Sequence, residues 1–126
     1  MQREKRSAKE ILHDLKMEIR SSQNTLIIAV DIGKIRHCAR FMSSAGKVLR
    51  RRFFFTNTID GFNQLMRQSK FYQRKEELPH TLFGMEPSGY YWIHLYEDLV
   101  SRGKRVVTVS TLSSQSQSRD YQCIQG

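Results

Sequence analysis

The sequence has no apolar run approaching the roughly 18 to 20 residues that a helix needs to cross a bilayer. Its two cysteines, Cys38 and Cys123, stand far apart and in no metal-ligand spacing, so reduced thiols are the simplest interpretation. The basic residues at the N-terminus have no apolar segment behind them, which is not the pattern of a secretory signal. We therefore expect a cytoplasmic protein without a membrane partner.

Several catalytic patterns are also missing. There is no phosphate-binding glycine loop of the P-loop type, and no serine stands in a nucleophile elbow. The histidines lack the helical or hairpin spacing of metal ligands, and we assign none of them a role: His13, His37, His80 and His94. These absences argue against the common hydrolase and P-loop chemistries.

Acidic residues are absent between Asp31 and Asp60, although the chain as a whole carries a net charge of +9. An uncompensated basic stretch of this kind attracts polyanions, and it favours nucleic-acid binding over a merely solvated basic face. The candidate nucleic-acid-binding residues in this stretch are Lys34, Arg36, Arg40, Arg50, Arg51 and Arg52.

The spacing of apolar residues predicts a helix at the N-terminus and then a mixture of strands and helices. Ser7 and Glu10 have the spacing of a capping box, in which each side chain satisfies a free backbone N–H. Residues 25–31 are β-branched and apolar without alternation, as in a strand covered on both faces. The expected elements are a helix over residues 7–21, strands over 25–31, 37–42 and 48–55, a helix from residue 57 or 58 to about 70, a strand over 81–86, a helix over 89–102 and a strand over 105–109.

Three strands, a helix, a strand, a helix and a strand form the order of a ribonuclease-H-like fold. We therefore predict an α/β fold with a mixed five-stranded sheet, flanking helices and a preceding N-terminal helix. The expected domain organisation is an amphipathic helix over residues 1–22, the α/β domain over 23–110 and a polar, disordered tail over 111–126.

Two carboxylates end two of the apolar strands. Asp31 follows the first strand and Glu86 follows the fourth, and these strands are neighbours in a ribonuclease-H-like sheet. Hard oxygen ligands placed in this way suit Mg²⁺, which takes one or two carboxylates together with phosphate and water. A turn-capping aspartate and an ion-paired glutamate are the alternative. A helix expected to begin at Gly89, with Ser88 as its cap, either points N–H groups at the same rim to hold a phosphate or only completes a tight turn.

Four segments together resemble one family: residues 28–34 (Ile-Ala-Val-Asp-Ile-Gly-Lys), 46–49 (Gly-Lys-Val-Leu), 57–62 (Asn-Thr-Ile-Asp-Gly-Phe) and 84–92 (Gly-Met-Glu-Pro-Ser-Gly-Tyr-Tyr-Trp). They are similar, in order, to the N-terminal domain of the DEDD transposases of the insertion-sequence-110 type. The resemblance implies a RuvC-like fold and four acidic metal ligands, of which Asp31 and Glu86 match the first two. The third and fourth are implied to be aspartates three residues apart beyond the fifth strand, where this sequence has one aspartate, Asp120.

The resemblance further implies DNA as substrate, a guide RNA, a homo-oligomeric full-length protein and a C-terminal domain that supplies a catalytic serine. That domain is not in this sequence, so we expect a truncated copy that binds nucleic acid without recombination, and we leave its enzymatic status open. Two alternatives stay open as well. One is a non-catalytic basic module that binds nucleic acid, and the other is a fragment of an actin-like kinase, because Asp31-Ile32-Gly33-Lys34 also resembles the phosphate-side turn of such enzymes.

Overall fold

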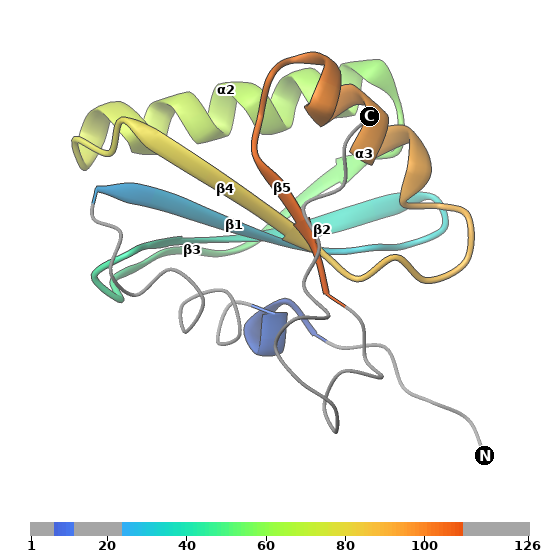
Figure 1. The fold of residues 1–126 in the computed structure, drawn as a ribbon, viewed down its shortest axis with the longest axis horizontal. Coiled ribbons are helices and arrows are strands. Elements are labelled where there is room, and N and C mark those ends of the chain that lie inside the picture. The colour runs from blue at the N-terminus through green and yellow to red at the C-terminus, as the bar shows by residue number, and fades with distance from the viewer. Residues whose placement is uncertain (1–6, 12–23, 110–126) are drawn as a thin grey trace.

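The computed structural model describes residues 7–11 and 24–109 of the chain. Residues 8–11 form one helical turn. The elements that follow are, in chain order, β1 (Thr25–Asp31), β2 (Arg36–Ser43), β3 (Val48–Thr56), α2 (Ile59–Lys75), β4 (His80–Met85), α3 (Ile93–Ser101) and β5 (Val106–Thr108) (Figure 1). This is the order that the sequence predicts.

The five strands form one sheet in the order β3-β2-β1-β4-β5. β1 pairs antiparallel with β2 and parallel with β4, and β5 is parallel to β4. The sheet is therefore mixed, with β1 at its centre, which confirms the ribonuclease-H-like α/β fold. The central position explains why residues 25–31 read as a continuous apolar run, since both faces of that strand are covered.

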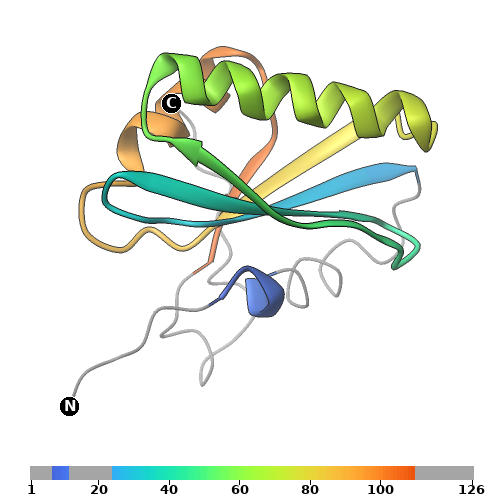
Figure 2. The same cartoon turned by 180° about the vertical axis from the view of Figure 1, so that it is seen from behind.

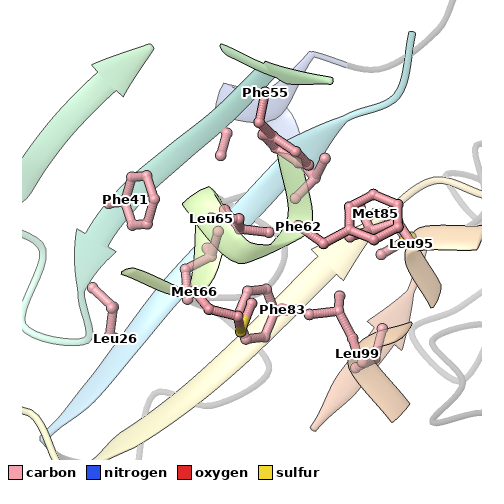
Figure 3. Close-up of a cluster of buried hydrophobic side chains, with 14 of the residues drawn as sticks. Leu26, Phe41, Phe55, Phe62, Leu65, Met66, Phe83, Met85, Leu95 and Leu99 are labelled. Carbon is pink, nitrogen blue, oxygen red and sulfur yellow. The ribbon is translucent and has the colours of Figure 1, made fainter. Parts of the chain in front are cut away.

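The two faces of the sheet are covered differently. α2 and α3 lie together on one face, and the helical turn of residues 8–11 lies on the other (Figures 1 and 2). On the helix side, Phe41, Phe83 and Met85 of the sheet pack with Phe62, Leu65, Leu95 and Leu99 of the helices, all at most 2% exposed (Figure 3). On the other side a smaller cluster joins Ile11 to Ile27, Ala29, Leu82, Val107 and Val109.

The N-terminal capping box is present as predicted. The backbone N–H of Ser7 donates to Glu10 Oε1 at 3.1 Å, and the N–H of Glu10 donates to Ser7 Oγ at 3.3 Å. One turn later, Ile11 is fully buried against the sheet. The remainder of the helix expected over residues 7–21, and the tail expected beyond residue 110, lie outside the described residues.

Helix α2 begins where the sequence places it but ends later. The Thr58 side chain caps it by accepting the N–H of Gly61 at 3.0 Å. The predicted end near residue 70 is wrong, because the helix continues to Lys75. Tyr72 explains the extension: it is 8% exposed, and its ring lies 5.2 Å from that of Phe41. Residues 71–75, beyond the predicted end, therefore belong to a packed helix.

Helix α3 begins later than predicted, at Ile93. Gly89 has a φ of +69°, which interrupts the helix expected to start there, and the Trp92 indole donates to the Gly89 carbonyl at 3.1 Å. The prediction of Ser88 as its cap is therefore wrong, and of the two alternatives left open at this rim the structure shows the turn. Leu95, Tyr96 and Leu99 are buried and form the side of α3 that packs in the core.

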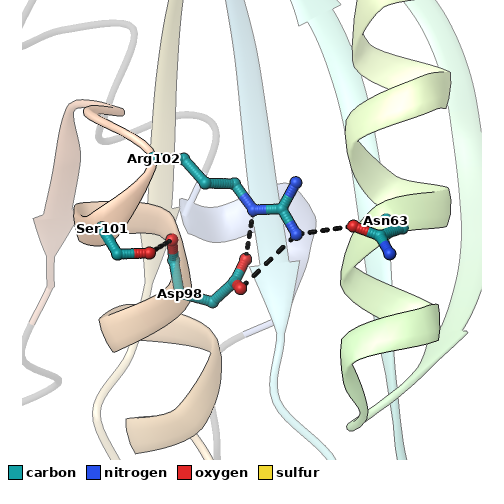
Figure 4. A network of polar contacts seen from close by, with 4 residues as sticks. All are labelled: Asn63, Asp98, Ser101 and Arg102. Carbon is teal, nitrogen blue, oxygen red and sulfur yellow. Dashed lines mark hydrogen bonds and ion pairs between the residues drawn. The ribbon is translucent and has the colours of Figure 1, made fainter.

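The end of α3 matches its prediction, with Arg102 as C-cap and Gly103 in a left-handed conformation, φ +76°. The Arg102 guanidinium also connects the two helices. It contacts Asp98 at 2.6 Å and donates to Asn63 Oδ1 of α2 at 2.7 Å (Figure 4). The helix layer is thus held both by the apolar cluster beneath it and by this polar contact between the helices.

Candidate functional site

Asp31 and Glu86 come from the ends of two neighbouring strands. β1 and β4 run parallel with Val30 opposite Met85, so the two carboxylate residues are the next position along the same register. Side chains alternate between the faces of a strand, which places both residues on the face of Ile27 and Leu82, away from the helices. Asp31 is half-buried and Glu86 is 6% exposed.

The turn that follows Asp31 is fixed by a backbone contact and a buried ring. Gly33 donates its N–H to His37 Nδ1 at 3.0 Å, and His37 is 1% exposed against the ring of Phe55. A Cβ atom on Gly33 would lie 2.1 Å from the carbonyl oxygen of Arg36, so only glycine fits without a shift of the backbone. This pair therefore determines the path of the chain immediately after Asp31.

Cys38 lies opposite Asp31 in the β1–β2 pair, and the pKa of its thiol depends on the charged groups around it. Burial raises the pKa of its thiol, and the negative charge of Asp31 raises it further. A hydrogen bond with the backbone of Phe53 and the positive charges of Arg52 and Arg36 lower the pKa in part. Carboxylate and guanidinium groups are therefore close enough on this side of the sheet to act on the same thiol.

An irregularity between β2 and β3 arranges the basic residues. Ala39 pairs with Phe53 and Phe41 pairs with Arg50, so Arg51 and Arg52 both stand opposite Arg40, as in a β-bulge. Arg50 bridges the bulge by donating its Nε–H to the carbonyl of Arg52 at 3.1 Å. A bulge on this outer strand thus gathers three arginines at one place.

The six candidate cations do not form a single row. Arg36 stacks on Phe54, with its guanidinium carbon 4.1 Å from the ring centroid. Arg50 instead lies over Phe53 at 5.3 Å, on the helix side. Lys34 is exposed in the turn after β1, and Arg40 is half-buried. We call the side of the sheet away from α2 and α3 the charged face; its residues are Asp31, Glu86, Arg36, Cys38, Arg40, Arg51 and Arg52.

The donor set is small for a metal site. Within the described part of the chain, no group of three or more His, Cys, Asp or Glu residues could hold a metal ion. Two carboxylates on one rim nonetheless fit Mg²⁺, which keeps several waters and takes its remaining ligands from substrate phosphate. Asp120, the third candidate acid, lies outside the described residues.

Sequence reasoning missed two parts of this site. The spacing of His37 predicts no metal site, yet its Nδ1 accepts the Gly33 N–H and supports the turn. The bulge was missed because Arg50, Arg51 and Arg52 read simply as part of a strand. The one available signal for His37 was its alternation with Ala39 and Phe41, which predicts an inward-facing side chain.

Most of the chain matches the sequence model of one known protein family. The sequence model of the DEDD transposases of the insertion-sequence-110 type, described as "Transposase", matches residues 28–123. The match includes β1 to β5 almost entirely, with Asp31, Glu86 and the basic stretch inside it. No curated protein matches the chain. Within residues 7–11 and 24–109, no helix combines the length and apolar character that a membrane span requires.

Proposed function

The chain belongs to the DEDD transposase family of the insertion-sequence-110 type, and from this premise we propose that it binds DNA on the charged face with a divalent metal ion at Asp31 and Glu86. The family acts in transposition, which gives the chain a role in that process. The proposal extends this role to the residues that contact the nucleic acid, and to the guide RNA and the homo-oligomer that the family resemblance implies.

One observation carries the proposal. Asp31 and Glu86 end adjacent parallel strands in one register, on the same side of the sheet as Arg36, Arg51 and Arg52. These three arginines are exposed, and none forms an ion pair with a carboxylate of residues 7–11 or 24–109. Cations without an acidic partner beside two carboxylates suit a phosphodiester whose charge is shared between arginines and a metal ion.

The residues of the charged face have different proposed roles. Asp31 and Glu86 would hold Mg²⁺, which when bound polarises a phosphate oxygen and lowers the pKa of a bound water. Arg51 and Arg52 would contact the phosphates of the DNA backbone and fix its position. Arg36, which its stack on Phe54 orients, would contact a neighbouring phosphate. His37 holds the turn after Asp31 by accepting the Gly33 N–H. It would therefore position Asp31, a proposed metal ligand, without contacting the DNA.

The proposal is tested with duplex and branched DNA in the presence of Mg²⁺ or EDTA. We expect Mg²⁺ to strengthen DNA binding by the 126-residue chain, and Asp31→Asn or Glu86→Gln to remove this dependence while leaving the salt-sensitive binding intact. We expect no cleavage or strand exchange, because two carboxylates do not complete the two-metal arrangement used for in-line displacement. Robust Mg²⁺-dependent cleavage by this chain would contradict the expected inactivity, and binding indifferent to Mg²⁺ would contradict the metal site.

A non-catalytic basic module is the second candidate. The exposed side chains of Arg36, Arg51 and Arg52 favour it, because arginines bind phosphates without a metal ion. The two candidates separate on one variant, Asp31→Ala with Glu86→Ala. A pure binding module should keep its affinity for DNA and its response to Mg²⁺ unchanged, whereas a metal site should lose that response.

A further inference from the structure

The outer side of α2 has a composition that packing does not explain. Its inner side supplies Phe62, Leu65, Met66, Ser69 and Tyr72 to the sheet, and all of them are buried. The outer side repeats at the helical intervals i, i+3, i+4, i+7 and i+8, and every one of its residues is exposed: Arg67, Lys70, Phe71, Arg74 and Lys75. Four cations and one aromatic ring thus share a single face.

A favourable interaction with the helix dipole accounts for only part of this pattern. Arg74 and Lys75 lie in the last turn, where a cation stabilises the helix. Arg67 and Lys70 lie earlier, beyond the reach of that effect. None of the four forms an ion pair with a carboxylate of the described residues, although Lys47 and Arg102 do so elsewhere. The charge of this face is therefore available to an external anion.

Phe71 adds a flat apolar surface among the cations. Its side chain is 51% exposed, and its ring is held edge-on against Tyr72 with centroids 5.0 Å apart. Lys75 Nζ lies 5.8 Å from the Phe71 centroid. The same five residues line a shallow hollow of about 560 Å³. An oriented aromatic ring in a hollow edged with cations is suited to stack on an unpaired base.

We propose that the outer side of α2 is a second binding site, which takes a single-stranded segment of nucleic acid through its phosphates and one unpaired base. The cations extend over nine residues, from Arg67 to Lys75, or about 12 Å of helix, enough for roughly three phosphates of one strand. α2 covers the face of the sheet opposite the charged face (Figures 1 and 2). The single-stranded nucleic acid on α2 is therefore separate from the DNA proposed to lie at Asp31 and Glu86. Its binding needs no metal ion.

The experiment uses the 126-residue chain in EDTA with short oligonucleotides that carry the fluorescent base 2-aminopurine. We expect the single strand to bind and the fluorescence of 2-aminopurine to be quenched when it does. DNA and RNA strands should bind with similar affinity, since the contacted groups are phosphates and the face of a base. Phe71→Ala should weaken single-strand binding about tenfold, the loss of one stack, and should abolish the quenching. Phe71→Leu keeps the apolar volume and should behave like Phe71→Ala.

Two further variants separate charge from stacking. The quadruple variant R67Q/K70Q/R74Q/K75Q should reduce the magnitude of the slope of log affinity against log salt by about 2 for a single strand, since about three phosphates lose their cations. The matched control, R51Q/R52Q, removes cations from the charged face and should leave the quenching at saturation unchanged. Asp31→Asn should leave it unchanged as well, so this proposal and the proposed function can fail independently.

Three results would overturn the inference. One is unchanged affinity and quenching in Phe71→Ala. Another is an equal loss of duplex and single-strand binding in that variant, which would indicate a face without a base site. The third is tighter binding to vesicles of anionic lipid than to any oligonucleotide. Urea unfolding of each variant shows whether it is folded, and a half-exposed Phe71 should be replaceable without loss of the fold.

Discussion

The two faces of the sheet are built for different purposes. The helix face buries the large side chains of β1, β2 and β4 against α2 and α3 in one continuous cluster (Figure 3). The charged face carries a smaller apolar cluster under residues 8–11, and its outer part is occupied by carboxylates and arginines. The apolar area buried on the helix face supplies most of the stability, which lets the other face carry charges that contribute little to folding.

Phenylalanine truncation on the two faces should give the largest contrast. Phe83 is fully buried on the helix face, whereas Phe54 is 44% exposed on the side of Cys38 and Arg36. We expect Phe83→Ala to lower the free energy of unfolding by about 3 to 5 kcal/mol through the cavity it leaves. Phe54→Ala should cost only about 1 kcal/mol, mainly its contact with Arg36. Urea unfolding followed by circular dichroism measures both, and equal losses would contradict the division between the faces.

Alanine at two glycines should give an intermediate effect. At Gly33 the added Cβ meets the Arg36 carbonyl, so the turn after Asp31 must move, and we expect a loss of about 2 to 3 kcal/mol. At Gly103, which ends α3, the Cβ meets no atom within 4 Å and only the left-handed φ is unfavourable, at about 1 kcal/mol. Gly33→Ala should also weaken the response to Mg²⁺, and Gly103→Ala should not. The reverse order of effects would show that the turn does not support Asp31.

The smallest effect is expected in the ionisation of Cys38. The charge of Asp31 contributes to the raised pKa of this thiol, so Asp31→Asn should lower that pKa, and Arg52→Gln should raise it further. In a Cys123→Ser background, the pH midpoint of iodoacetamide alkylation should move down in the first variant and up in the second. Because the folded-state pKa is raised, the thiol contributes stability below its unfolded pKa, and this stability is lost as pH rises through the folded value. Identical midpoints would place Asp31 away from Cys38.

The fold was largely predictable because its strongest signals are local. β1 was predicted with its observed bounds, since a continuous apolar run between polar turns leaves little choice. Ser7 and Glu10 were identified by capping chemistry that depends on a few neighbouring residues, and the start of α2 was limited to residue 57 or 58, of which Thr58 is the cap. The adjacency of β1 and β4 followed from the order of the elements.

What the sequence did not reveal depends on contacts between distant residues. The last part of α2 is held in place because Tyr72 packs on Phe41 of β2, and the composition of residues 71–75 alone does not predict that contact. The late start of α3 depends on the left-handed conformation of Gly89. The sequence Pro-Ser-Gly alone does not show whether the helix begins there or the chain makes a turn first. The role of His37 depends on the Gly33 N–H, and the bulge at Arg51 and Arg52 depends on the register against β2.

The most direct test of the division between the faces replaces Mg²⁺ with paramagnetic Mn²⁺ and follows the backbone amide signals of the chain by NMR. We expect the signals nearest Asp31, Glu86 and Cys38 to broaden first, at low Mn²⁺. The signals of α2, from Leu65 to Arg74, should persist on the far side of the sheet. Broadening that begins in α2, or that is uniform along the chain and unchanged by Asp31→Asn with Glu86→Gln, would contradict a metal site on the charged face.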